Sequence, residues 1–417
     1  MEFLAGIPFE LWVAGVLAFY MAWAIGANDV ANAMGTSVGS GALTLAGAIV
    51  VASLLEFLGA FLAGGHVTDT VRKGMIDMDL VTKDQLIYGM LASLASAATL
   101  LLGATRFGLP VSTTHSIVGA IVGFGAVAIG VEAVKWAKVG QIVLSWVTSP
   151  LLAGVTAFAI FQFTRAKILD RSDPVSEVKK LGPFFFFFVF FVIGLVTLFK
   201  GLKNLKLDLD LPEALLGAAI LGLVGGALGT FFIRRVARDE EQEGGRFDRV
   251  ERIFVVLQIL TACAVAFAHG SNDVANSIGP LAAIASAVST DEIASKAPVA
   301  PWMLAIGGVG IVIGLATWGY RVMETVGKRI TELTPSRGFA AELAAALTIV
   351  LASRFGIPVS TTHTLVGAVL GVGLARGIGA LDLRVVGSIL ASWVATLPIA
   401  ACLSIFFYFF FKGLLSP

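Results

Sequence analysis

The stretch AIGANDVANAMG, at residues 24 to 35, returns in altered form as AHGSNDVANSIG at residues 268 to 279. A second shared motif follows each copy, as GLPVSTTHSIVGA at 108 to 120 and GIPVSTTHTLVGA at 356 to 368. Two motifs that recur in the same order in an apolar chain indicate two versions of one unit that meet around a polar site. The rest of the chain is expected to be scaffold for these four segments.

Composition sets the class of protein. The chain is 57% hydrophobic and 14% charged, with a mean hydropathy of +0.91. These values predict an all-α polytopic membrane protein embedded in a lipid bilayer. The net charge of +1 provides no basic surface for nucleic acid. Cys263 and Cys402 both lie in apolar runs, so they indicate neither a disulfide framework nor a metal site.

The apolar runs predict about twelve transmembrane segments. They lie at residues 9–30, 40–64, 85–105, 116–131, 138–163, 184–200, 212–233, 251–268, 299–320, 338–354, 364–379 and 385–411. The runs 116–131 and 364–379 are short for a full span and could be re-entrant. The predicted parts are a first repeat at 1–163, a linker with two further helices at 164–250, and a second repeat at 251–417.

The linkers 164–183 and 234–252 are rich in Lys and Arg. Both are expected on the cytoplasmic side by the positive-inside rule, and the two spans between them are consistent with this. The second repeat then enters the membrane from the cytoplasm, whereas the first, with no Lys or Arg before its first span, enters from outside. We therefore expect inverted repeats, in which secondary transporters hold substrate and ions near the midplane. The predicted location is the plasma (inner) membrane.

Each Asn-Asp-Val-Ala-Asn motif places a carboxylate within or at the end of an apolar span, where it costs several kcal/mol unless it has a function. The two Asn of each motif are four residues apart and share one helix face. Carboxylate and amide oxygens suit a hard cation such as Na⁺. The predicted sodium ligands are Asp29, Asn32, Asp273 and Asn276. A polar pair that holds helices together is the alternative for a single copy, and duplication makes it less favoured.

Glycines precede both Asn-Asp pairs. Gly26 and Gly270 are predicted to let the helix break there, which would turn backbone carbonyl groups toward a ligand.

Three hydroxyl residues follow a proline in each copy of the second motif and precede a new apolar helix. Pro110 and Pro358 end the preceding segment, so the hydroxyl groups lie at a helix N-terminus. Free N–H groups, hydroxyl groups and the positive end of the helix dipole favour an oxyanion. The predicted phosphate ligands are Ser112, Thr113, Thr114, Ser360, Thr361 and Thr362, with Asn28 and Asn272 beside them. Ordinary N-capping by Ser or Thr is the alternative.

The pairing of carboxylates with hydroxyl groups favours phosphate over sulfate. Phosphate near neutral pH retains a P–OH group that can donate to a buried carboxylate, whereas fully ionised sulfate would repel it. Cations bound at the same time would neutralise both the carboxylates and the substrate.

Other ionisable residues lie in apolar surroundings. Glu56 and Glu342 are candidates for coupling, because intramembrane acids are usually functional. His115, His269 and His363 adjoin the motifs, and they either form a proton relay or, as the favoured interpretation, make structural hydrogen bonds.

At these four segments the chain resembles the inorganic phosphate transporter (PiT) family. The segments GANDVANA, GSNDVANS and the two PVSTTH motifs match that family's signatures, and the layout covers nearly the whole chain. The resemblance implies an inverted-repeat transporter that carries phosphate with Na⁺ or, in many members, H⁺. It also implies that the substrate and ion site comprises the residues assigned above, and that Glu56 and Glu342 occupy acidic positions important in sodium-coupled members.

The leading hypothesis is a secondary active transporter that couples phosphate to Na⁺ symport by alternating access. The alternatives are proton-coupled phosphate transport, transport of another oxyanion such as sulfate, and a passive channel. An intramembrane Ser/Thr-His hydrolase would need one asymmetric nucleophile, and a nucleotide-binding motif is missing, so no enzyme activity and no cofactor are expected. GxxxG-like spacings allow a homodimer, but they also suit internal packing.

The motif assignment predicts the effect of neutralising either aspartate. Asp29→Asn or Asp273→Asn should abolish coupled phosphate uptake in liposomes while the protein remains folded, because each change removes a cation ligand of full charge. Wild-type uptake by either variant would contradict the assignment.

Overall fold

The computed structural model describes residues 8–64, 75–198, 209–236, 246–290, 299–354 and 359–416. This part of the chain is helical, and its only β pairing is an isolated bridge between Ile76 and Val134. Ten of its helical stretches are long and apolar enough to cross a membrane. Two shorter apolar helices, Thr113–Ala128 and Thr361–Ala375, correspond to the runs predicted as short. The prediction of an all-α polytopic membrane protein is confirmed.

Helices of the first half are α2 (Phe9–Asp29), α3 (Ala31–Gly39), α4 (Leu45–Ala63), α6 (Lys83–Arg106), α7 (Thr113–Ala128) and α8 (Trp136–Thr164). The inserted pair is α9 (Pro174–Val196) and α10 (Leu211–Val236). The second half contains α11 (Arg246–Thr290), α12 (Pro301–Trp318), α13 (Tyr320–Glu324), α14 (Pro335–Arg354), α15 (Thr361–Ala375) and α16 (Leu383–Leu415). Pro358 and residues 237–245 of the basic linker, which entered the sequence predictions, lie outside the described residues.

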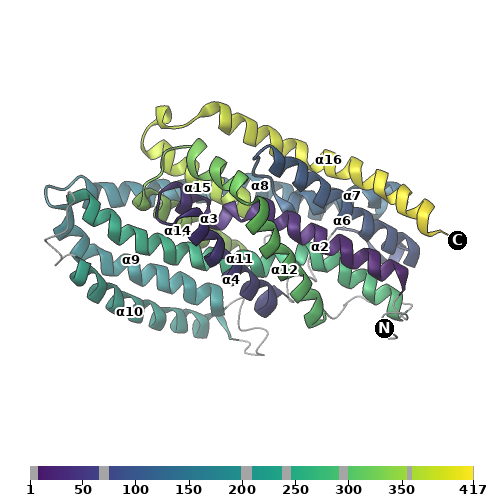
Figure 1. Cartoon of the computed structure of the whole chain (residues 1–417), viewed down its shortest axis with the longest axis horizontal. Coiled ribbons are helices and arrows are strands. Elements are labelled where there is room, and N and C mark those ends of the chain that lie inside the picture. Colours follow the sequence, from purple (N-terminus) through teal and green to yellow (C-terminus); the bar gives the residue numbers. More distant parts are fainter. Residues whose placement is uncertain are drawn as a thin grey trace.

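The helices pair reciprocally between the two halves of the chain. The first helix of each half packs against the next long helix of the other half, α2 on α12 and α11 on α4. The same exchange recurs for the short helices, since α7 packs along α16 and α15 along α8. In Figure 1, α6 and α7 lie toward one end of the molecule and α14 and α15 toward the other, and α16 runs along one edge. Such exchanged contacts are expected of two related repeats.

Glycines permit the closest of these helix contacts. A Cβ atom at Gly26 would overlap the backbone of Ile311, and one at Gly270 would overlap the backbone of Glu56. The prediction that the helix breaks at these glycines is wrong: α11 is continuous through Gly270, and α2 is interrupted only after Asp29, at Val30. The reason is that glycine also lets two helix backbones approach closely within a membrane bundle. Gly26 and Gly270 serve this close packing and do not interrupt their helices.

The inserted helices α9 and α10 pack against each other through phenylalanines and glycines. Phe186 and Phe190 lie on Gly229 and Gly225 of α10, where a Cβ atom would overlap their rings. Phe185 is buried and faces inward, with its ring centroid 5.6 Å from that of Phe339 on α14. The aromatic run of α9 therefore joins this pair to the second half of the chain.

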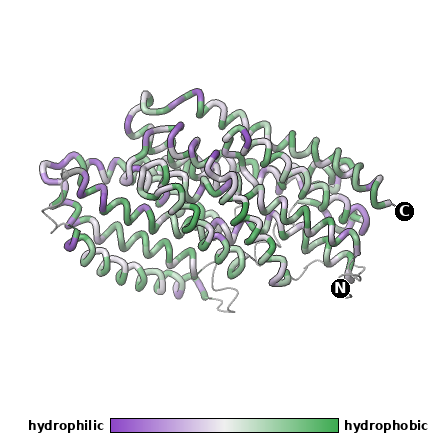
Figure 2. Tube along the Cα trace, in the orientation of Figure 1, coloured by the Kyte–Doolittle hydropathy of each residue, from purple (hydrophilic) through white to green (hydrophobic). Residues whose placement is uncertain are grey.

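Hydrophobic residues cover most of each long helix, and hydrophilic residues gather at helix ends and at a few places within the bundle (Figure 2). This distribution is typical of a helical membrane protein, in which an apolar exterior meets lipid. The inner polar places contain the repeated motifs.

Gly26 and Gly15 on the same helix provide a matched test of the packing. Gly26→Ala should lower the free energy of unfolding by about 1–3 kcal/mol, because the new methyl group meets fixed backbone atoms of Ile311. Gly15→Ala should leave it nearly unchanged, because nothing lies within 4 Å of that position. Thermal melting of the purified protein in detergent measures the difference, and equal melting temperatures would contradict the packing described.

Candidate functional site

Asn28 fastens the turn between α6 and α7 to the end of α2. Its side-chain nitrogen donates to the Thr105 hydroxyl at 2.9 Å and to the Leu109 carbonyl at 3.1 Å. Its side-chain oxygen accepts from the backbone N–H of Val111 at 3.1 Å. All of the polar atoms of this amide therefore contact the turn. Asn28 was predicted to bind phosphate; in the structure its amide is bonded to the end of α6 and to the turn.

The first hydroxyl residue of each triplet caps the helix that follows. Ser112 Oγ accepts from the backbone N–H of His115 at 3.3 Å, and Ser360 Oγ accepts from that of His363 at 3.2 Å. The capping alternative therefore describes these two oxygens, whose own O–H groups can still donate. Thr114 of the first triplet is half-buried beside them.

Both short helices begin at Asp29. This carboxylate is fully buried and accepts from the Thr113 hydroxyl of α7 at 2.7 Å and from the Thr362 hydroxyl of α15 at 3.3 Å. The Asn32 side chain donates to Thr362 at 2.8 Å and, more weakly, to Thr361 at 3.5 Å. Residues from the two halves of the chain, remote in sequence, thus share one buried polar centre.

Asp273 lies in the same centre with a different set of contacts. The Thr361 hydroxyl donates to it at 3.5 Å and the Asn272 side chain at 2.9 Å. Asn272 is half-buried and bonds to its neighbour, so it does not fasten a turn as Asn28 does. Asn276 is buried one helical turn further along α11. The two motifs are therefore alike in sequence and unlike in their contacts.

His269 stands between three acids. Its Nε2 atom lies 2.7 Å from Asp273 and 3.9 Å from Asp29, and its Nδ1 atom lies 3.2 Å from Glu56. Side-chain atoms of His269, Asp29 and Asp273 that could ligate a metal lie within 4.8 Å of one another. The sequence showed that His269 adjoins the second motif, but it did not predict that His269 lies between the three acids. Its counterpart in the first copy is Ile25, and that difference between the copies was the available signal.

The two coupling candidates occupy different places. Glu56 is fully buried and reaches the centre through His269. Glu342 is also fully buried, but it lies in a second polar cluster, where it accepts from Thr36, from Ser37 at 2.8 Å and from Thr261 at 2.7 Å. Glu342 is therefore not part of the central group of acids.

His115 and His363 face each other behind the helix starts, with ring centroids 4.2 Å apart. Each stacks on a tryptophan, His115 on Trp146 at 3.4 Å and His363 on Trp393 at 3.6 Å. The Trp393 indole N–H donates to the Pro110 carbonyl at 3.1 Å. These contacts favour the structural interpretation of the two histidines.

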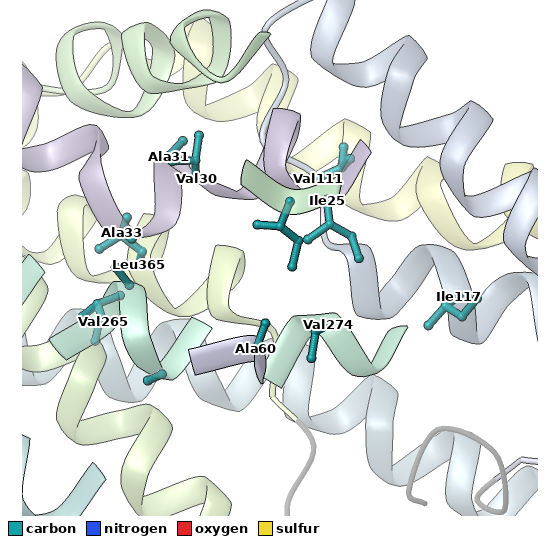
Figure 3. Packing of buried hydrophobic residues seen from close by; sticks show 14 of the residues in the cluster. Ile25, Val30, Ala31, Ala33, Ala60, Val111, Ile117, Val265, Val274 and Leu365 are labelled. Atoms are coloured by element: carbon teal, nitrogen blue, oxygen red, sulfur yellow. The ribbon is translucent and has the colours of Figure 1, made fainter. Parts of the chain in front are cut away.

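Apolar residues adjoin the polar residues of the centre. Figure 3 shows Ile25, Val111 and Val274, from both halves of the chain, among the buried apolar side chains of the bundle. All three are buried. A carboxylate in such a low-dielectric setting requires hydrogen bonds or a cation, so the centre suits a cation held together with an anion that accepts from hydroxyl groups.

Ten long apolar helices and a buried polar centre built from two repeated motifs define a membrane transporter. The phosphate transporter family model matches residues 25–404, and the chain belongs to this family. Membership places it among transporters and not among enzymes.

Similar proteins cover nearly the whole chain. A protein of Haemophilus influenzae named as a phosphate permease is 46% identical over 409 residues, which are 97% of this chain and 97% of that protein. The chloroplastic inorganic phosphate transporter 2-1 of Arabidopsis thaliana is 43% identical over 96% of this chain and 72% of its own length. A solved structure described as the sodium-dependent phosphate transporter is 41% identical, with a TM-score of 0.89 over 97% of this chain and 100% of that one.

The unequal contacts of the two asparagines lead to a prediction. Asn28→Ala removes three hydrogen bonds that hold the α6–α7 turn, so it should lower the melting temperature in detergent more than Asn272→Ala, which removes one. The measurement is made without phosphate, so that ligand binding does not contribute. Equal melting temperatures would show that the turn does not depend on Asn28.

Proposed function

We propose that the chain is a secondary active transporter that moves inorganic phosphate together with Na⁺ by alternating access. The observation that carries this proposal is the buried meeting of both short helices at Asp29. The relatives named for phosphate transport, and the solved structure named as sodium-dependent, support the choice of phosphate and Na⁺.

The hydroxyl groups at the two helix starts supply the anion half of the site. Three hydroxyl groups donate to the two aspartates: those of Thr113 and Thr362 to Asp29, and that of Thr361 to Asp273. Rotation of each hydroxyl would direct its O–H group to a phosphate oxygen. Two helix N-termini add N–H groups and the positive ends of their dipoles. The set contains no Lys or Arg, which suits a site that must release its anion on the other side.

The carboxylates supply the cation half. Asp29 and Asp273 place carboxylate oxygens near the amides of Asn32 and Asn276, and neither oxygen of Glu56 accepts a hydrogen bond from the described residues. Oxygen ligands of this kind suit Na⁺, whose charge would offset the desolvation of the acids. Sodium would then have to bind before or with phosphate, since the bare acids repel an anion.

Proton coupling is the second candidate, and His269 favours it. An imidazole within 3.9 Å of Asp29 and closer to Asp273 and Glu56 could carry a charge that takes the place of a cation. The two candidates differ in which gradient drives uptake.

Glu342 is proposed to take part in coupling from the second polar cluster. Its carboxylate and the hydroxyl groups of Ser37 and Thr261 connect α14, α3 and α11, which surround the central site. A change of charge at Glu342 would therefore alter the packing of α3, which begins two residues after Asp29 and contains Asn32. The plasma membrane is the proposed location.

Reconstituted protein in liposomes tests the proposal. Phosphate uptake is measured with an inward Na⁺ gradient, an inward proton gradient, or neither. We expect accumulation above equilibrium only with Na⁺, because the acids need a cation when phosphate binds. Glu56→Gln should weaken Na⁺ dependence, whereas Glu177→Gln, at a half-buried acid of α9 that pairs with Lys180, serves as the control.

Each other outcome selects a different function. Accumulation driven by protons alone would assign coupling to His269 and the acids around it. Uptake that only equilibrates phosphate and ignores both gradients would indicate a channel or a uniporter.

A further inference from the structure

The two histidines of the PVSTTH motifs are buried side by side, but they are not bonded equally. His115 has no exposed surface, His363 is 2% exposed, and their ring centroids are 4.2 Å apart. The Nδ1 atom of His363 lies 3.3 Å from the carbonyl oxygen of Trp146. Because a carbonyl oxygen only accepts, this nitrogen carries the hydrogen, and the Nε2 atom of the neutral ring has a free lone pair. That atom and both ring nitrogens of His115 have no hydrogen-bond partner among the described residues.

A proline gives His363 its partner. In an α-helix the N–H group of each residue donates to the carbonyl group four residues earlier. Pro150, inside α8, has no N–H group, so the Trp146 carbonyl has no partner within its own helix and accepts from His363 instead. The Nδ1 hydrogen bond therefore depends on a proline in the neighbouring helix.

The second half of the chain lacks the matching carbonyl. It repeats the Ser-Trp pair of α8 at residues 392 and 393 of α16, but its proline stands at 398, one residue further from the tryptophan. Pro398 therefore leaves the carbonyl of Val394 without a helix partner, and not that of Trp393. This shift of one residue accounts for the unpaired nitrogens of His115.

Tryptophan rings adjoin the pair, and acids do not. Trp146 stacks on His115 and Trp393 on His363. In the described part of the chain no acid lies within 4.0 Å of a ring nitrogen of either histidine, whereas His269 contacts three acids. A charge on either imidazole would be buried without an ion pair, so the pair is neutral in this arrangement.

The ionisable groups of the helices packed on α7 and α15 belong to other sites. On α11, His269 and Asp273 contact each other, and on α14, Glu342 belongs to the second polar cluster. The acids and bases of α6, and the Lys and Arg of α8 and α16, lie near the ends of those helices. α7 and α15 have no ionisable residue besides the two histidines. The pair can therefore titrate as a unit of its own.

Each histidine directly follows a hydroxyl triplet. The backbone N–H of His115 donates to Ser112 Oγ at 3.3 Å, and that of His363 donates to Ser360 Oγ at 3.2 Å. Both rings therefore belong to the first turn of the short helices whose N-termini are proposed to bind phosphate. A positive charge in that turn adds to the positive end of the helix dipole, and in an apolar interior it attracts an anion strongly.

We propose that His115 and His363 form a proton-binding site that takes up one proton when phosphate is bound, and that this proton retains the anion. The inference rests on the proposed function. Phosphate supplies the negative charge that the surroundings of the pair lack. The proton, from the water that enters with the substrate, adds to the free lone pair of one ring, and the second ring then resists a further charge so close to the first.

This role differs from proton coupling at His269. A charge on His269 would take the place of a cation beside the acids, whereas a charge on the pair strengthens phosphate binding. Because the binding of the proton and that of phosphate promote each other reciprocally, acid should lower the dissociation constant of phosphate and slow its release. Transport then becomes slower in acid although phosphate binds more tightly.

The test measures phosphate binding in detergent, by equilibrium dialysis at saturating Na⁺, and phosphate uptake in liposomes. Both are measured at about pH 7.5 and 5.5, on either side of the value of about 6.5 at which an imidazole in water changes charge. Wild type, His115→Gln and His363→Gln are compared at the same pH, so that the ionisation of phosphate itself cancels. We expect the wild-type dissociation constant to fall with acid at least about threefold relative to either variant, with a similar relative fall in kcat.

Two proline variants supply a test that keeps both histidines. Pro150→Ala retains the Cβ atom that packs against Gly367, and it adds an N–H group that competes for the Trp146 carbonyl. It should reduce the effect of acid, because the charged form of His363 loses its acceptor. Pro398→Ala is the matched control and should keep the wild-type effect, because Pro398 does not free a carbonyl that a histidine uses.

Two results would overturn the proposal. One is an effect of acid that is the same in wild type, both histidine variants and Pro150→Ala. The other is an effect of acid on the half-saturating Na⁺ concentration and not on phosphate binding, which would assign the proton to His269. If the histidine variants bind no phosphate at either pH, the comparison of the two proline variants decides. Absence of phosphate binding and uptake by the wild type would instead refute the proposed function.

Discussion

The structure depends on one buried carboxylate. Asp29 has no exposed surface, although it is the last residue of an apolar helix, and it accepts hydrogen bonds from hydroxyl groups of α7 and α15. A charge in that position would be costly unless every surrounding donor is directed to it or a cation neutralises it. The two short helices must therefore begin at the same point, and the turns, the long helices beside them and the enclosing apolar residues follow from that requirement.

Close backbone packing makes this arrangement possible. In a membrane bundle, lipid is as apolar as the helix surface, so association relies on contact and on polar bonds. Gly26 and Gly270 bring α2 against α12 and α11 against α4 at equivalent positions in the two motifs. The same residue type that was expected to break the helix instead allows it to continue past its neighbour, and this keeps the Asn-Asp pair at the centre of the molecule.

The two halves of the chain share their helix packing and their motifs, but they differ in their ionisable residues. His269 stands where the first half has Ile25. Glu56 and Glu342 each lie in one half of the chain, and the other half has no acid at the matching position. The hydroxyl triplets and aspartates are duplicated, so they provide the same binding groups from both sides. His269, Glu56 and Glu342 each occur in one half only, so the two halves surround the central site with different charged groups.

Composition, apolar length and the duplicated motifs were enough to establish an all-helical membrane transporter and the group of polar residues at its centre, because bilayer thickness and the cost of buried charge act on the sequence directly. The partners of those residues could not be predicted. Tertiary structure decided that Asn28 holds a turn, that His269 joins three acids and that Glu342 lies apart. These are contacts between helices remote in sequence, and they depend on crossing geometry and close approach, which residue spacing along one helix does not encode.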